Sequence, residues 1–108
     1  MPKQIKYTSK FKKDMKPYKH DKKFKNDLAQ FFSYVQYGLE LPPKYNNHTL
    51  SGEYVGEYDA HIRPNLVIIY HTTDDEVICM RIGTHNKLGL TESIKKIYKL
   101  LIKESNNE

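Results

Sequence analysis

Residues 65–83, NLVIIYHTTDDEVICMRIG, decide the fold of this chain. Two apolar segments are joined by the acidic turn TDDE, which is the pattern of an antiparallel β-hairpin. The run from Leu66 to Tyr70 is continuously apolar, so it predicts a central strand covered on both faces. The second strand ends at Arg81, and His85 follows after a short turn.

The chain before this hairpin begins with a strand and a short helix. Residues 4–9, QIKYTS, alternate polar and apolar side chains, which predicts a strand. Thr8 or the serine after it is suited to cap a helix whose Phe11 and Met15 lie on one side. Pro17 then ends or kinks this helix because proline lacks an amide donor.

A second helix is predicted to begin after Asp21, a suitable cap, and to stop at Gly38. Its apolar residues follow helical spacing: Phe24, Leu28, Phe31, Phe32, Val35 and Leu39. Residues 52–62 have a strand pattern interrupted by glycines, and residues 91–104 form an amphipathic helical pattern. The order predicts one α+β domain over residues 1–108, with two N-terminal helices on a small antiparallel sheet and an extra C-terminal helix.

Composition narrows the class of protein. Hydrophobic residues make up 38% and charged residues 29% of the 108, which is not the composition of a disordered chain. The longest apolar run is too short to span a bilayer, and no apolar segment follows the N-terminal lysines as a secretory signal would require. A cytoplasmic location without membrane association is the default expectation. Cys79 is the lone cysteine, and a buried inert thiol is expected there.

Positive charge is concentrated at the front of the chain. The formal net charge is +5, and residues 1–27 hold ten lysines against three aspartates. Such a surface favours a polyanionic partner, namely RNA, DNA or an acidic protein. A solvated helical face that is merely rich in lysine explains the same charge equally well.

Strand alternation gathers titratable side chains on one predicted face. Asp59, His61 and Arg63 alternate with Tyr58, Ala60 and Ile62, which face the other way. In the second strand of the hairpin, residues 76–82, Arg81 is predicted to share a face with Val77 and Cys79. Ile78, Met80 and Ile82 are predicted to point to the core. His48 and His85 are expected to overhang the Asp59 face from loops.

This set of side chains suits RNA cleavage without a metal. The reaction needs a base for the 2′-hydroxyl proton, an acid for the leaving 5′-oxygen and cations for the phosphate. Histidine serves both proton roles near neutral pH, and arginine binds phosphate oxygens with a planar fork. Taken singly, each histidine is more often structural. A zinc site is the other alternative, but no closely spaced histidine pair or second cysteine supports it, and Arg81 opposes a cation.

The segment from residue 41 to 88 resembles the RelE/ParE toxin superfamily, and within it the YafQ-like branch of mRNA interferases. The matching motifs are Leu41-Pro42, His48, Leu50-Ser51-Gly52, Tyr58-Asp59-Ala60-His61-Ile62, Pro64-Asn65, Ile69-Tyr70, Arg81-Ile82-Gly83-Thr84-His85 and Leu88. The resemblance implies a RelE-like fold and a metal-independent, cofactor-free endoribonuclease that cuts mRNA in the ribosomal A site. It also implies a hetero-oligomer with an acidic, DNA-binding antitoxin that neutralises the toxin.

The resemblance assigns roles to individual residues. His85 is the expected general acid or base, His48 and His61 the further proton-transfer or phosphate-contacting groups, Arg81 the transition-state cation and Asp59 a supporting carboxylate. Residues expected to contact RNA are Asn65, Lys87, Arg63 and Tyr58.

Two positions depart from the family pattern. Asn65 stands where the family has an aspartate, and asparagine cannot serve as a base. Gly89 stands where the family has an aromatic residue. Two other functions remain open: a ParE-like toxin that shares the fold and inhibits gyrase, and a member, degenerate at Asn65 and Gly89, that only binds RNA or protein.

Overall fold

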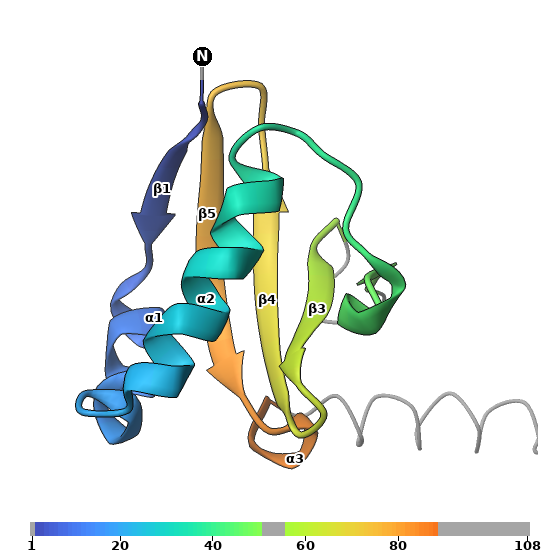
Figure 1. Cartoon of the computed structure of the whole chain (residues 1–108). Coiled ribbons are helices and arrows are strands. Elements are labelled where there is room, and N and C mark those ends of the chain that lie inside the picture. Colours follow the sequence, from blue (N-terminus) through green and yellow to red (C-terminus); the bar gives the residue numbers. More distant parts are fainter. Residues whose placement is uncertain (1, 51–55, 89–108) are drawn as a thin grey trace, which may run out of the picture.

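A five-stranded sheet forms the centre of the molecule, with strand order β1-β5-β4-β3-β2 (Figure 1). The computed structural model describes residues 2–50 and 56–88, so the predicted helix 91–104 and the glycines at 52 and 89 lie outside the described residues. The strands are β1 (Gln4–Tyr7), β2 (His48–Thr49), β3 (Tyr58–Arg63), β4 (Leu66–Thr72) and β5 (Glu76–Gly83).

The two predicted N-terminal helices are present, and their caps are the predicted ones. They are α1 (Ser9–Asp14) and α2 (Lys22–Val35), followed further along the chain by α3 (His85–Leu88). Short 3₁₀ helices lie at Lys16–Tyr18 and Pro43–Tyr45. The Thr8 hydroxyl accepts the Phe11 N–H at 3.1 Å, and the Asp21 carboxylate accepts the Phe24 N–H at 2.9 Å.

Gly38 terminates the second helical segment as predicted, with a φ of +67° in the left-handed region that glycine tolerates best. Leu39 was predicted on the buried side of the helix, but it lies beyond the helix end and is 57% exposed. None of the helices in the described part of the chain is long and apolar enough to cross a membrane.

Most strand pairs are antiparallel, as the hairpin pattern predicted. β4 pairs antiparallel with both β3 and β5, and β2 pairs antiparallel with β3. The exception is β1, which runs parallel to β5 in the register Gln4↔Glu76. Parallel neighbours need a long connection, and here it comprises both helices and three strands. The sheet is therefore mixed and not wholly antiparallel.

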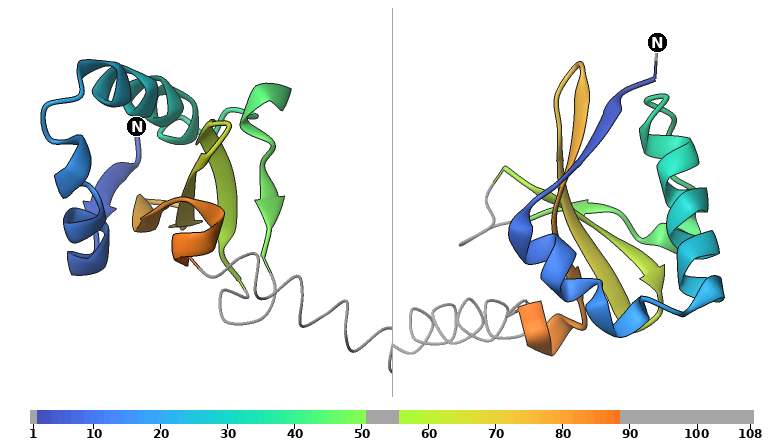
Figure 2. Two further views of the ribbon diagram at one scale, coloured as in Figure 1. Left: turned by 90° about the horizontal axis from the view of Figure 1, so that it is seen from below. Right: turned by 90° about the vertical axis from the view of Figure 1, so that its left-hand side faces the viewer.

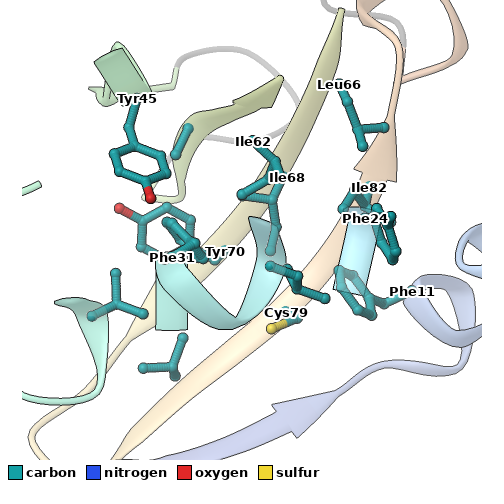
Figure 3. Close-up of a cluster of buried hydrophobic side chains, with 14 residues drawn as sticks. Phe11, Phe24, Phe31, Tyr45, Ile62, Leu66, Ile68, Tyr70, Cys79 and Ile82 are labelled. Carbon is teal, nitrogen blue, oxygen red and sulfur yellow. The ribbon is translucent and has the colours of Figure 1, made fainter. Parts of the chain in front are cut away.

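The main core lies between α2 and one face of the sheet. Phe24, Phe31 and Val35 from α2 pack with Ile68 and Cys79 from the strands, all in one buried cluster (Figure 3). Cys79 is fully buried, and burial raises the pKa of its thiol to about 12, which fits the expected inert thiol.

A smaller core covers the opposite face. Val67 and Ile69 of β4 bury their side chains there with Leu88 of α3. Views from two directions place α2 and α3 on opposite sides of the sheet (Figure 2). Because Ile68 and Tyr70 face the main core, β4 is covered on both faces, as its continuous apolar run predicted.

A β-bulge in β5 overturns part of the predicted alternation. Tyr70 pairs with Cys79, but Ile69 pairs with Arg81, so Met80 is an extra residue in the strand. Met80 packs against the smaller core, whereas Val77 and Cys79 lie in the main core. The predictions that Val77 and Cys79 share a face with Arg81, and that Ile78 and Met80 face the main core, are wrong, whereas Ile82 lies in the main core as predicted.

Candidate active site

The predicted catalytic side chains lie on the sheet face opposite α2. The register aligns His48 of β2 with Asp59 of β3, Asp59 with Ile69 of β4, and Ile69 with Arg81 of β5. Residues in one such cross-strand row project on the same side. His48 therefore belongs to a short edge strand and not to a loop as predicted.

His48 and Asp59 are in direct contact within this row. Nδ1 of His48 lies 3.0 Å from Oδ1 of Asp59. The Asp59 side chain is only 8% exposed, whereas that of His48 is 54% exposed. The carboxylate thus fixes the orientation of an imidazole that solvent and a ligand can reach.

The neighbouring row brings His61 to His85. His61 pairs with Val67, and Val67 pairs with Gly83, where β5 ends. His85 begins α3, and its ring centroid lies 5.0 Å from that of His61 at an interplanar angle of 55°. The two imidazoles therefore lie next to each other at the end of the sheet.

Packing of α3 on the sheet sets the position of His85. Leu88 is buried on Val67 and Ile69 in the smaller core, which draws the helix over the open face. A Cβ at Gly83 would lie 3.1 Å from Cδ of Lys87 and 3.5 Å from Cδ2 of Leu88, so a side chain there would require the Lys87 side chain to shift. Glycine at the strand end permits this close return of the chain.

Arg81 and Lys87 share one buried carboxylate, that of Asp14 at the end of α1. Nε of Arg81 donates to Oδ2 of Asp14 at 2.7 Å, and its Nη2 donates to Oδ1 at 3.2 Å. The Ile82 backbone N–H donates to the same Oδ2 at 3.1 Å, and Nζ of Lys87 lies 3.6 Å from Oδ1. Asp14 therefore holds the side chains of Arg81 and Lys87 beside the sheet face that carries the histidines.

The Asp14 carboxylate is stabilised in its ionised form. Burial raises the pKa of this group, but hydrogen bonds from Arg81 and Ile82 and the charges of Arg81 and Lys87 outweigh burial and lower the pKa overall. Sequence reasoning missed Asp14. The available signal was its spacing of three residues after Phe11, which puts it on the buried side of the helix among lysines.

Arg63 lies apart from the histidines. The register shifts between His61 and Arg63, and the guanidinium binds α2, with Nε 3.0 Å from Asp27 Oδ2 and Nη2 3.3 Å from both Asp21 carboxylate oxygens. The prediction that Arg63 shares a face with Asp59 and His61 is therefore wrong. The bulge after His61 is the cause.

The other two residues expected to contact RNA occupy different places. Asn65 is exposed in the turn between β3 and β4, at the same end of the sheet as α3 (Figure 1). Tyr58 stacks on Tyr70 with ring centroids 5.7 Å apart and packs against the main core, on the opposite side from the histidines. The β3–β4 turn that carries Asn65 is thus at the α3 end of the sheet, whereas Tyr58 lies on the face away from the histidines.

His71 takes no part in the cluster. Its Nδ1 lies 3.3 Å from the Gly56 carbonyl oxygen and 3.6 Å from a Glu57 carboxylate oxygen. These contacts give His71 a structural position near the end of β4.

Comparison with known proteins places the whole described chain in one family. Residues 3–90 match the family described as bacterial toxin of type II toxin-antitoxin system, YafQ. The mRNA interferase toxin YafQ of Escherichia coli K12 is 34% identical over 85 residues, which cover 78% of this chain and 92% of that protein. A putative YafQ toxin from Haemophilus influenzae is 38% identical over 56 residues, 48% of this chain and 55% of that one.

Solved structures agree with the sequence match. YafQ in the Escherichia coli DinJ-YafQ toxin-antitoxin complex has a TM-score of 0.70 and 32% identity, covering 82% of this chain and 98% of that one. A copper-bound mutant toxin from Helicobacter pylori has a TM-score of 0.73 and 26% identity, and the match covers 82% of this chain and 99% of that one. The Staphylococcus aureus YoeB dimer shares the fold, with a TM-score of 0.67 and 16% identity. The match covers 79% of this chain and 99% of that one.

Proposed function

Because the chain belongs to the YafQ family of type II toxin–antitoxin toxins, we propose that it is an mRNA interferase, an endoribonuclease that stops translation by cutting mRNA. The observation that carries this proposal is the pairing of His61 with His85, 5.0 Å apart between ring centroids, beside Asp59 and His48. Two imidazoles at one position can move two protons in a single displacement at phosphorus.

The proposed reaction uses the RNA's own 2′-hydroxyl as the nucleophile. One imidazole of the His61 and His85 pair takes the proton of the 2′-hydroxyl, and the other gives a proton to the leaving 5′-oxygen. His85 is the preferred general acid or base. The 2′-oxygen bonds to phosphorus, the bond from phosphorus to the 5′-oxygen breaks, and the leaving oxygen receives the other proton. The products are a 2′,3′-cyclic phosphate and a 5′-hydroxyl end. Neither step needs a metal, because histidine changes protonation near neutral pH.

His48 and Asp59 are proposed to act as a pair. The Asp59 carboxylate, 3.0 Å from Nδ1 of His48, would accept a hydrogen bond from that nitrogen and orient the ring on the open face. The oriented imidazole would contact the phosphate or serve as a further proton-transfer group. Asp59 itself would position His48 and would not exchange protons with the substrate.

Arg81 and Lys87 supply the remaining positive charge. Neighbouring strands lie about 4.8 Å apart, so Arg81 and Asp59, on either side of β4, are separated by about 10 Å. A phosphate with its ribose can bridge that span. Asp14 is the proposed positioning residue, because its two bonds to the Arg81 guanidinium fix the cation before RNA arrives.

The partners follow from the family and the charge. We propose that the toxin acts on mRNA in the ribosomal A site, that its lysine-rich N-terminal segment contacts ribosomal RNA, and that Asn65 and Lys87 contact the message. An antitoxin with acidic segments would neutralise it in a hetero-oligomer; the Escherichia coli relative is known in a toxin-antitoxin complex with DinJ. The histidine cluster favours RNA cleavage over gyrase inhibition, which requires no proton transfer.

The test is cleavage of a defined mRNA in a reconstituted translation system. Wild-type protein should cut ribosome-bound mRNA, while His85→Gln and His61→Gln should each slow cleavage by about 10²-fold or more. His71→Gln is the matched control, because that histidine lies outside the cluster. A wild type that leaves the mRNA intact but blocks supercoiling by gyrase would instead support the ParE-like alternative.

A further inference from the structure

A hollow of about 260 Å³ lies between α2, the 3₁₀ helix Pro43–Tyr45 and the last residues of β3. Both helices contact β3. Its lining includes polar side chains from all three elements: Asp27, Gln30, Lys44, His61 and Arg63. The ring centroid of His61 also lies 5.0 Å from that of His85, so the hollow adjoins the candidate active site without being part of it.

We propose that this hollow binds one nucleobase of the message, from a nucleotide next to the phosphate that is cut, and that Gln30 reads the base. The proposal deepens the proposed function and rests on it for RNA as the substrate. The volume of the hollow is that of roughly eight or nine water molecules in the liquid, which suits one flat base and is too small for a folded partner. Proteins commonly read single-stranded RNA in this way: an unstacked base lies on a planar side chain while hydrogen bonds contact its edge.

Arg63 supplies a planar group whose position is already fixed. Its Nε donates to Asp27 Oδ2 at 3.0 Å, and its Nη2 lies 3.3 Å from both carboxylate oxygens of Asp21. The Arg63 side chain is 26% exposed, so part of it remains open to a ligand. Because two carboxylates compensate its charge, the guanidinium is better suited to stacking on a base than to holding a phosphate.

Gln30 and Lys44 supply hydrogen-bonding groups that distinguish one base from another. Gln30 is exposed on α2, and its amide offers a donor and an acceptor side by side, which match two neighbouring groups on a base edge. Lys44 is exposed and adds a donor, with its Nζ 5.1 Å from the centroid of the Tyr45 ring. Contacts to base edges carry sequence information, whereas contacts to phosphate do not.

His61 connects the hollow to the chemistry. The register shift between His61 and Arg63 turns the arginine toward α2, while the histidine stays beside His85. A base in the hollow is joined to its own ribose and phosphate by a few bonds, so these groups would lie at the imidazole pair. One nucleotide would thus be read by Gln30 and presented to His61 at the same time.

Cleavage of a randomised mRNA library tests the reading of the base. The bases around the cut are varied, and the cut sites are sequenced after treatment in the reconstituted translation system. The wild type should prefer particular bases at one position flanking the cut, and Gln30→Leu should reduce that preference by about 10-fold or more. Gln30→Glu removes the donor and keeps the acceptor, so it should change the order of the preferred bases. Gln36→Leu is the matched control at the other end of α2, outside the hollow, and should keep the wild-type preference.

A binding measurement on the wild type depends neither on cleavage nor on the folding of a variant. The 3′-monophosphates of adenosine, guanosine, cytidine and uridine are titrated into the protein, with ribose 5-phosphate as the control without a base. The side-chain amide NMR signals of Gln30 should shift with at least one nucleotide, and those of Gln36 should stay in place. Absence of a Gln30 shift, or an equal shift with ribose 5-phosphate, overturns the base site.

The two assays separate failure of this site from failure of the proposed function. A wild type that does not cut mRNA overturns the ribonuclease, and the nucleotide titration still decides whether the hollow binds a base. A wild type that cuts, with the same base preference in Gln30→Leu, overturns the reading of the base by Gln30 and leaves the ribonuclease standing.

Discussion

Replacing Asp14 with asparagine should destabilise the fold and weaken the reaction together. The substitution keeps the shape of the side chain but removes the charge that Arg81 and Lys87 contact. One oxygen of the asparagine can still accept from the Ile82 N–H. The loss is therefore that of the ionic hydrogen bonds, and not that of the whole contact.

The magnitude follows from burial. The Asp14 side chain is 6% exposed and that of Arg81 is 23% exposed, so the pair is only partly screened by water. Hydrogen bonds to charged groups contribute about 1.5–3 kcal/mol each, and losing one partner of a fully buried pair costs roughly 3–5 kcal/mol. For this half-shielded pair we expect Asp14→Asn to lower the free energy of unfolding by about 2–4 kcal/mol.

The stabilisation by Asp14 should depend on pH, because only the ionised carboxylate provides it. The pKa of Asp14 is lowered in the folded protein, so the ionised form stabilises the fold at any pH above the ordinary carboxyl pKa of about 3.9. That stabilisation is lost as the pH falls through the lowered pKa. The difference between wild type and Asp14→Asn should be full at pH 6–7 and should shrink below about pH 4.

Urea denaturation at several pH values measures this difference, with Asp74→Asn in the exposed hairpin turn as the control. The control should change the free energy of unfolding by no more than about 0.5 kcal/mol. Equal stability of Asp14→Asn and wild type at pH 7 would show that the charge of Asp14 does not stabilise the fold. So would a loss that stays the same size at pH 3, because it would then not depend on the charge.

Three other predictions concern the core, the strand end and the imidazole pair. Phe31→Ala, at a fully buried position, should lower the free energy of unfolding by about 3–5 kcal/mol in denaturant titrations, and a loss under 1 kcal/mol would contradict the packing. Gly83→Ala should reduce mRNA cleavage more than stability, because its Cβ would lie 3.1 Å from Lys87 Cδ and force that side chain, which contacts Asp14, to shift; unchanged activity would mean that cleavage does not depend on the position of Lys87. His48→Gln should slow cleavage less than His85→Gln does at pH 7, and the reverse order in the same assay would give His48 the leading role.

The local parts of the fold were predictable from sequence because local contacts determine them. The helix caps at Thr8 and Asp21 each bind an amide three residues later. Gly38 ends the second helical segment through its own left-handed conformation. The double coverage of β4 was readable from five successive apolar residues.

Most of the failures involve distant partners. An extra residue at Met80 changes which side chains of β5 face the core, and this depends on pairing with β4 and not on the β5 sequence. A second irregularity turns Arg63 toward the aspartates of α2. The parallel pairing of β1 with β5 joins segments about seventy residues apart, and no short-range pattern encodes it.

The candidate site was predictable in its residue types and only partly in its geometry. Period-two alternation correctly put Asp59 and His61 on one face, where His48 joins them from β2. The contact of His85 with His61 depends on Leu88 packing on the sheet, and the role of Asp14 depends on α1 lying against β5. Both are tertiary contacts that single-sequence periodicity does not contain.

The most direct test of the central claim is the chemistry of the cut ends. Ribosome-bound mRNA treated with wild-type protein and with His85→Gln should be analysed for the terminal groups of the fragments. We predict fragments with 2′,3′-cyclic phosphate and 5′-hydroxyl ends from the wild type, and a cleavage rate lower by about 10²-fold or more from the variant. Intact mRNA with the wild type, or equal cleavage by His85→Gln, would contradict catalysis by the histidine pair.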